Sequence, residues 1–94
     1  MIRLNAFFQV KTDGDKLKAI ELGNELVAES LKDNGCVSYG LFTSTTRHDV
    51  LMFCETWTDQ ASLAAHMDST HFKRIVPLIE ALTANGMKLE KFEF

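Results

Sequence analysis

The segment from Val50 to Thr58 constrains the fold most, because it alternates like a β-strand and is largely apolar on both faces. One face carries Leu51, Phe53, Glu55 and Trp57, and the other carries Val50, Met52, Cys54 and Thr56. A strand with one face open to water normally alternates between apolar and polar residues. Helices can cover one face of the sheet, so something else must cover the second. We therefore expect a homodimer.

Patterns of period two and of helical period divide the 94 residues into alternating segments. Strands are predicted at residues 2–10, 36–45, 50–58 and 87–94, and helical regions at residues 16–32 and 59–84. The second helical region is expected to break near Asp68–Thr70 and to kink or divide again at Pro77. The apolar stripe of the first helix is predicted to be Leu17, Ile20, Val27 and Leu31.

The order β-α-β-β-α-β predicts a ferredoxin-like α+β sandwich with a four-stranded antiparallel sheet. Right-handed crossovers place both helical regions on the same face of that sheet. The pattern contains no linker, so we expect a single domain over residues 1–94. A chain this short builds a marginal core, which association can reinforce.

Composition excludes several classes of partner. The formal net charge is −3 and the basic residues form no cluster, which argues against nucleic-acid binding. No apolar run is long enough for a membrane span and no signal peptide opens the chain, so we expect a cytoplasmic protein without membrane association. Cys36 and Cys54 lack CxxC spacing and neighbouring ligand residues, which indicates reduced, packed thiols and no metal.

Three stretches of sequence resemble the antibiotic biosynthesis monooxygenase family of dimeric α+β barrels. They are residues 34–39 (Asn-Gly-Cys-Val-Ser-Tyr), 53–57 (Phe-Cys-Glu-Thr-Trp) and 69–72 (Ser-Thr-His-Phe), with His66 in the helix between the last two. The resemblance covers essentially the whole chain. It implies a homodimer in which two sheets face each other as a barrel. The family includes cofactor-independent oxygenases, haem-degrading enzymes and isomerases, so the resemblance does not fix the reaction.

The resemblance suggests His66, Trp57 and Asn5 as catalytic residues. His66 matches a family histidine, and a neutral imidazole suits proton abstraction near neutral pH; a structural histidine is the alternative. Trp57 would form a flat wall of an aromatic pocket, or simply fill the core. Asn5 would either point at an oxygen of the ligand or tie down backbone.

Tyr39, Glu55 and His71 are the candidates for substrate binding. The Tyr39 hydroxyl could anchor a phenol or carbonyl, although packing is the favoured reading. Burial of Glu55 would raise its pKa and make it an acid or base, but an ion pair, for instance across the dimer, is preferred. His71 could cap its helix or lie at the mouth of the pocket.

The leading hypothesis is a cofactor-independent monooxygenase that oxidises a small electron-rich aromatic, a quinol or naphthol, with O2. His66 would be the base, Asn5 and Tyr39 the anchors and Trp57 the wall. The alternatives are an isomerase of a small carbonyl compound and a non-catalytic dimer that binds a small ligand. A phosphorylated substrate would need a basic group in the pocket; the candidates are Arg3, Arg47, Lys73 and Arg74.

No cofactor is expected. The iron-ligating histidine of the haem-degrading branch falls near Ile75 and Val76 in this chain, where no histidine is present. A GxGxxG motif and a phosphate-binding P-loop are also absent. The substrate must therefore supply its own electrons if the chain is an oxygenase.

Overall fold

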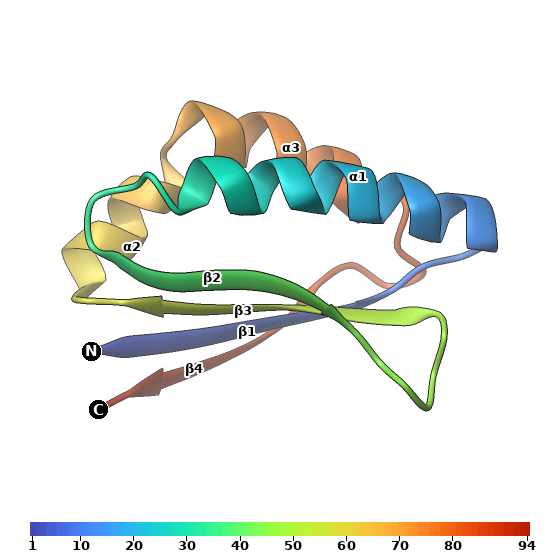
Figure 1. The fold of residues 1–94 in the computed structure, drawn as a ribbon, viewed down its shortest axis with the longest axis horizontal. Coiled ribbons are helices and arrows are strands. Elements are labelled where there is room, and N and C mark those ends of the chain that lie inside the picture. Colours follow the sequence, from blue (N-terminus) through green and yellow to red (C-terminus); the bar gives the residue numbers. More distant parts are fainter.

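The computed structural model describes residues 1–94 and contains one four-stranded antiparallel sheet with helices on a single face (Figure 1). The elements are β1 (Ile2–Gln9), α1 (Asp13–Ser30), β2 (Cys36–Thr43), β3 (Val50–Trp57), α2 (Gln60–Met67), α3 (Thr70–Glu80) and β4 (Lys88–Glu93). The strands lie in the order β2-β3-β1-β4, and every neighbouring pair is antiparallel. This is the ferredoxin-like α+β arrangement, so the predicted fold class is confirmed.

Each helix begins at a side chain that accepts a hydrogen bond from a backbone N–H three residues later. The pairs are Thr12 with Asp15 (3.0 Å), Asp59 with Ser62 (2.8 Å) and Ser69 with Phe72 (3.2 Å). Such caps satisfy N–H groups that have no partner inside the helix. The cap at Ser69 starts a new helix directly after α2, so the predicted break near residues 68–70 is confirmed.

Of the two alternatives predicted for Pro77, a kink or a division of the helical region, the division is wrong, because α3 continues through Pro77 to Glu80. Proline removes one backbone hydrogen bond from a helix interior. Ile75 and Ile79, on either side of Pro77, are completely buried. Their packing offsets the missing bond and keeps the helix whole.

The predicted buried stripe of α1 is only partly correct: Ile20 and Val27 are half-buried and pack against the core, but the two ends of the stripe do not. Leu17 and Leu31 are exposed, and the buried face of α1 consists of Ala19, Leu22, Gly23, Leu26 and Ser30. The cause is the close approach of the helix to the sheet. A Cβ atom added to Gly23 would lie 2.6 Å from Leu41 Cδ2 and 3.2 Å from the Phe53 ring, so glycine allows this approach without a shift of those side chains. The buried face therefore combines the small residues Ala19, Gly23 and Ser30 with Leu22 and Leu26.

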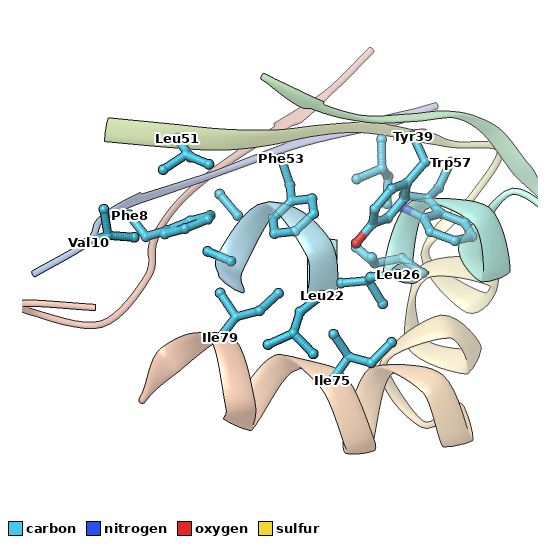
Figure 2. Packing of buried hydrophobic residues seen from close by; sticks show 14 residues of the cluster. Phe8, Val10, Leu22, Leu26, Tyr39, Leu51, Phe53, Trp57, Ile75 and Ile79 are labelled. Carbon is cyan, nitrogen blue, oxygen red and sulfur yellow. The ribbon is translucent and has the colours of Figure 1, made fainter. Parts of the chain in front are cut away.

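The core fills the layer between the sheet and the helices (Figure 2). Phe53 lies at its centre, with the Phe8 ring stacked at 5.8 Å and the Tyr39 ring at 5.9 Å. Leu22 from α1 and Ile75 from α3 meet these rings from the helix side (Figure 2). No helix combines the length and the apolar character that crossing a membrane requires.

The opposite face of the sheet carries no helix (Figure 1). At its centre, Arg3 Nη2 donates to Cys54 Sγ (2.6 Å) and Arg3 Nε donates to Asn5 Oδ1 (3.3 Å). The outer strands add the half-exposed rings of Phe42 and Phe92. This open face, formed by the outward side chains of the four strands, is thus polar in the middle and aromatic toward its edges.

Candidate active site

A cavity of about 190 Å³ lies between the sheet and the helices. Ten of its twelve lining residues are hydrophobic, and the two charged ones are Glu55 and Glu80. Its walls include Ala6 on β1 and both Phe72 and Val76 on α3. A 150 Å³ apolar cavity is known to hold benzene, so this space suits a small aromatic molecule.

Glu55 is the buried ionisable group of this cavity. Its side chain is on the helix face of β3, and the residue is only 3% exposed. Burial raises the pKa of Glu55 to about 7, while the indole N–H of Trp57 and the hydroxyl of Tyr39 act in the opposite direction. Glu55 forms no ion pair within the chain, unlike the preferred reading of the sequence. It can therefore gain or lose a proton near neutral pH.

Tyr39 lies opposite Glu55 in the β2–β3 ladder and also lines the cavity. Its ring points from the sheet into the helix layer (Figure 2). Burial, followed by the neighbouring negative charge of Glu55, raises the pKa of the Tyr39 phenol well above its ordinary value. The phenol therefore keeps its proton, and this single O–H can donate to the ionised Glu55 or, once Glu55 is protonated, to a ligand.

Trp57 lies behind Glu55 and does not line the cavity. The residue is fully buried, and its indole N–H donates to Glu55 Oε1 at 2.9 Å. Trp57 therefore orients the Glu55 carboxylate through this hydrogen bond. It does not form the wall of the cavity, which was one of its two predicted roles.

His66 is buried next to Trp57, with ring centroids 4.6 Å apart, and it does not line the cavity either. Its Nδ1 lies 2.8 Å from Asp33 Oδ2, and its Nε2 is buried without a partner. Burial lowers the pKa of His66, and the Asp33 carboxylate opposes that shift. The contact of His66 with the cavity is therefore indirect, through the rings of Tyr39 (5.4 Å) and Phe72 (5.2 Å), which line it.

His71 joins the same group from the first turn of α3. Its Nε2 lies 2.9 Å from Asp33 Oδ2, the oxygen that His66 also contacts. The cap of α3 is Ser69, so His71 is not the capping residue. Sequence reasoning missed Asp33, whose place directly before the Asn34-Gly35 turn was its only signal.

Asn5 is separated from all of these residues by the sheet. Its neighbours Leu4 and Ala6 line the cavity, so the side chain of Asn5 points to the open face. There its Oδ1 accepts from Cys54 Sγ (3.2 Å), and its Nδ2 donates to Glu90 (3.5 Å). The structure brings Tyr39 and Glu55 together at the cavity, and leaves Asn5 outside it.

Comparison with known proteins agrees with this architecture. The model of the antibiotic biosynthesis monooxygenase family matches residues 1–78. The chain belongs to this family. The resemblance carried by residues 34–39, 53–57 and 69–72 is thereby confirmed.

One curated relative and two solved structures match between 81% and 99% of this chain. "Putative monooxygenase YcnE" of Bacillus subtilis (strain 168) is 28% identical over 76 residues, which are 81% of this chain and 79% of that protein. A structure from Bacteroides thetaiotaomicron VPI-5482, described as a conserved protein of unknown function and possible oxidoreductase, is 50% identical. It has a TM-score of 0.93 and covers 99% of this chain and 96% of its own. A conserved protein from Methanosarcina mazei Go1 is 32% identical, with a TM-score of 0.93 over 98% of this chain and 90% of its own.

Proposed function

We propose that this member of the family is a cofactor-independent monooxygenase that oxidises a small phenolic aromatic, of the naphthol or quinol type, with O2. The observation that carries the proposal is Glu55, a carboxyl with a pKa of about 7 that faces a largely apolar cavity. A base poised near neutral pH is suited to removing a phenolic proton. The names of the relatives support oxygen chemistry as the step that follows.

The proposed reaction needs little from the protein beyond binding and proton transfer. Glu55 takes the phenolic proton, and the electron-rich phenolate then gives an electron to O2. One oxygen atom enters the ring and the other leaves as water, so a naphthol and O2 give a quinone and water. Tyr39, as a neutral donor, supports the negative oxygen of the substrate during this step. The hydrophobic walls exclude water from the anion.

Glu55 replaces His66 as the proposed base. Glu55 lines the cavity, whereas His66 lies behind Tyr39 and Phe72, two lining residues whose rings it contacts. A base must reach the proton that it removes, so the position of the carboxyl at the cavity supports Glu55 over His66. Asn5 has no part in this mechanism, because it faces the other side of the sheet.

The lining of the cavity also bears on the alternatives. It contains no lysine or arginine, so nothing there would balance a phosphate group. Lys73 pairs with Asp68 at 2.6 Å, and Arg74 pairs with Glu25. An isomerase of an unphosphorylated carbonyl compound remains a second candidate, because Glu55 would also serve to move a proton there. It predicts turnover without oxygen uptake.

We also propose that the protein works as a homodimer through its open face. Phe42 and Phe92 are 54% and 52% exposed on the outer strands, on the face that no helix covers. Exposed aromatic side chains around a hydrogen-bonded centre suit a face that a second sheet covers. The family's barrel arrangement supports the same pairing.

The test is oxygen consumption by the purified, EDTA-treated protein with a panel of naphthols and quinols. Glu55→Gln is expected to lower kcat/KM by about 10²–10⁴-fold, the usual contribution of a general base. Glu80→Gln is the matched control, because Glu80 lines the same cavity but is exposed. No uptake by the wild type above the autoxidation blank would overturn the oxygenase. Uptake that Glu55→Gln leaves intact would remove Glu55 from the mechanism.

A further inference from the structure

We propose that Asp33, His66 and His71 form a binding site for one divalent transition-metal ion of the zinc type. The three side chains come from three places in the chain: the turn after α1, the last turn of α2 and the first turn of α3. The site is independent of the proposed oxidation, since none of the three residues lines the cavity.

The three potential ligand atoms lie close to one another. Both His66 Nδ1 (2.8 Å) and His71 Nε2 (2.9 Å) face the same carboxylate oxygen, Asp33 Oδ2, and all three atoms lie within 4.8 Å of one another. Two ring donors that served hydrogen bonding alone could have used the two oxygens of the carboxylate separately. Instead, both ring nitrogens approach the same oxygen, which keeps the three atoms close together.

The geometry lies close to that of a real metal site. Zinc binds imidazole nitrogen and carboxylate oxygen at about 2.0–2.2 Å, which puts the ligand atoms of a tetrahedral site roughly 3.4 Å apart. The two contacts to Asp33 would lengthen by about half an ångström, and the two nitrogens would move to a similar separation.

The chemistry and the charge of the cluster suit a divalent ion. Two imidazoles and one carboxylate form a donor set that zinc and its neighbours in the first transition row accept. Asp33 pairs with no lysine or arginine, and the nearby Lys32 pairs with Glu29 at 3.4 Å. A bound cation would therefore neutralise a carboxylate whose only partners are the two histidines.

The proposed metal site is buried on the side of His66 and partly open to solvent on the side of His71 and Asp33. The ring of His66 is only 1% exposed and packs on Trp57 and Phe72, which fixes its orientation. The side chains of His71 and Asp33 are 16% and 19% exposed, so an ion can enter from their side. Three protein ligands leave at least one position for water. The ion would tie the start of β2 to both α2 and α3.

Metal titration of the full chain tests the site without any assay of activity. After treatment with EDTA and its removal by dialysis, the protein is titrated with Co²⁺ and followed by visible absorption, with the stoichiometry taken from calorimetry. Zn²⁺ is then added in a thermal unfolding experiment. We expect one ion per chain, a Zn²⁺-dependent rise in Tm, and reversal of both effects by EDTA.

Two variants locate the ion. His71→Gln and Asp33→Asn each remove one ligand but keep a polar side chain of similar shape, and each is expected to weaken Co²⁺ binding by at least about 100-fold. His48→Gln is the control, because His48 is 81% exposed in a distant turn and should leave binding unchanged. Circular dichroism of the metal-free variants shows that they fold; should Asp33→Asn fail to do so, the more peripheral His71→Gln still decides.

The absence of both Co²⁺ absorption and a Zn²⁺-dependent rise in Tm in the wild type would overturn the proposal. Asp33 would then simply accept two hydrogen bonds. Binding that survives in both variants would also overturn it, because the ion would have to lie elsewhere. Neither result depends on whether the chain consumes oxygen, so this proposal and the proposed function fail or stand separately.

Discussion

The indole N–H of Trp57 donates a 2.9 Å hydrogen bond to Oε1 of Glu55, two residues earlier on the same face of β3. Burial pushes the pKa of Glu55 up, and this bond pushes it down. The acid is thereby left with a pKa of about 7 instead of a permanently protonated or permanently charged state. Two of the expected results below follow from the position of Glu55 in its cavity.

The stability of the protein is expected to fall as the pH rises through the range in which Glu55 ionises. The folded-state pKa of about 7 lies above the ordinary value of 4.5. Between these two values the unfolded chain releases a proton that the folded chain keeps, so the free energy of unfolding decreases with increasing pH. The loss from this one group is about 3 kcal/mol.

Urea unfolding at about pH 4 and about pH 8 measures this effect. Because other groups also titrate, the quantity to follow is the difference in unfolding free energy between the wild type and Glu55→Gln. From the lower to the higher pH, the wild type should lose about 3 kcal/mol of unfolding free energy relative to Glu55→Gln. An unchanged difference would mean that Glu55 is not buried as the structure shows.

Trp57→Phe is expected to move the pH dependence of activity to higher pH. The variant keeps an aromatic ring but loses the N–H that stabilises the ionised form of Glu55, so the pKa of Glu55 rises further. A hydrogen bond to a charged group is worth enough to shift the midpoint of kcat/KM against pH by about one pH unit. A midpoint that stays in place would separate Trp57 from the ionisation of the base.

Val76→Phe is expected to weaken the binding of a naphthol by at least about tenfold, because the larger side chain enters the cavity that Val76 lines. Leu78→Phe is the control on the same helix, since Leu78 is 50% exposed and does not line the cavity. Titration calorimetry compares the two. Equal affinities in both variants would mean that the ligand binds somewhere else.

Phe42→Glu is expected to prevent the proposed pairing and leave the protein monomeric, because it places a charge on the open face. Leu17→Glu is the matched control: Leu17 is 71% exposed on α1, away from that face. Sedimentation of both variants at micromolar concentration measures the effect. A wild type that sediments as a monomer, or a Phe42→Glu dimer, would refute pairing through the open face.

The strands could be predicted from the sequence because successive side chains of a strand point to opposite faces, and this alternation does not depend on how the helices pack. The buried face of α1 could not, because it depends on how closely the helix approaches Leu41, and only Gly23 permits that approach. Hydrophobicity alone favours Leu17, which the structure leaves exposed. Small residues carry little signal in a pattern read one helix at a time.

The site was harder to predict than the fold, because its members are defined by which face of the sheet they occupy. Asn5 and Glu55 are both polar residues within apolar strands, yet the cavity lies on the side of Glu55 only. The family motif pointed to His66, but a motif does not state which side chain touches the empty space. Asp33, which holds both His66 and His71, lies in a turn and has no periodic pattern to reveal it.

Trp57 is the only tryptophan in the chain, and its N–H is bonded to the group proposed to move the proton. Ionisation of Glu55 changes the electric field across the indole ring, and so does any protonation of His66, whose ring lies 4.6 Å away, so the emission of the unlabelled protein reports on these two neighbours. The molecule therefore contains its own optical indicator of proton occupancy. Stopped-flow fluorescence can follow the arrival of a substrate proton at Glu55 without dye, mutation or isotope.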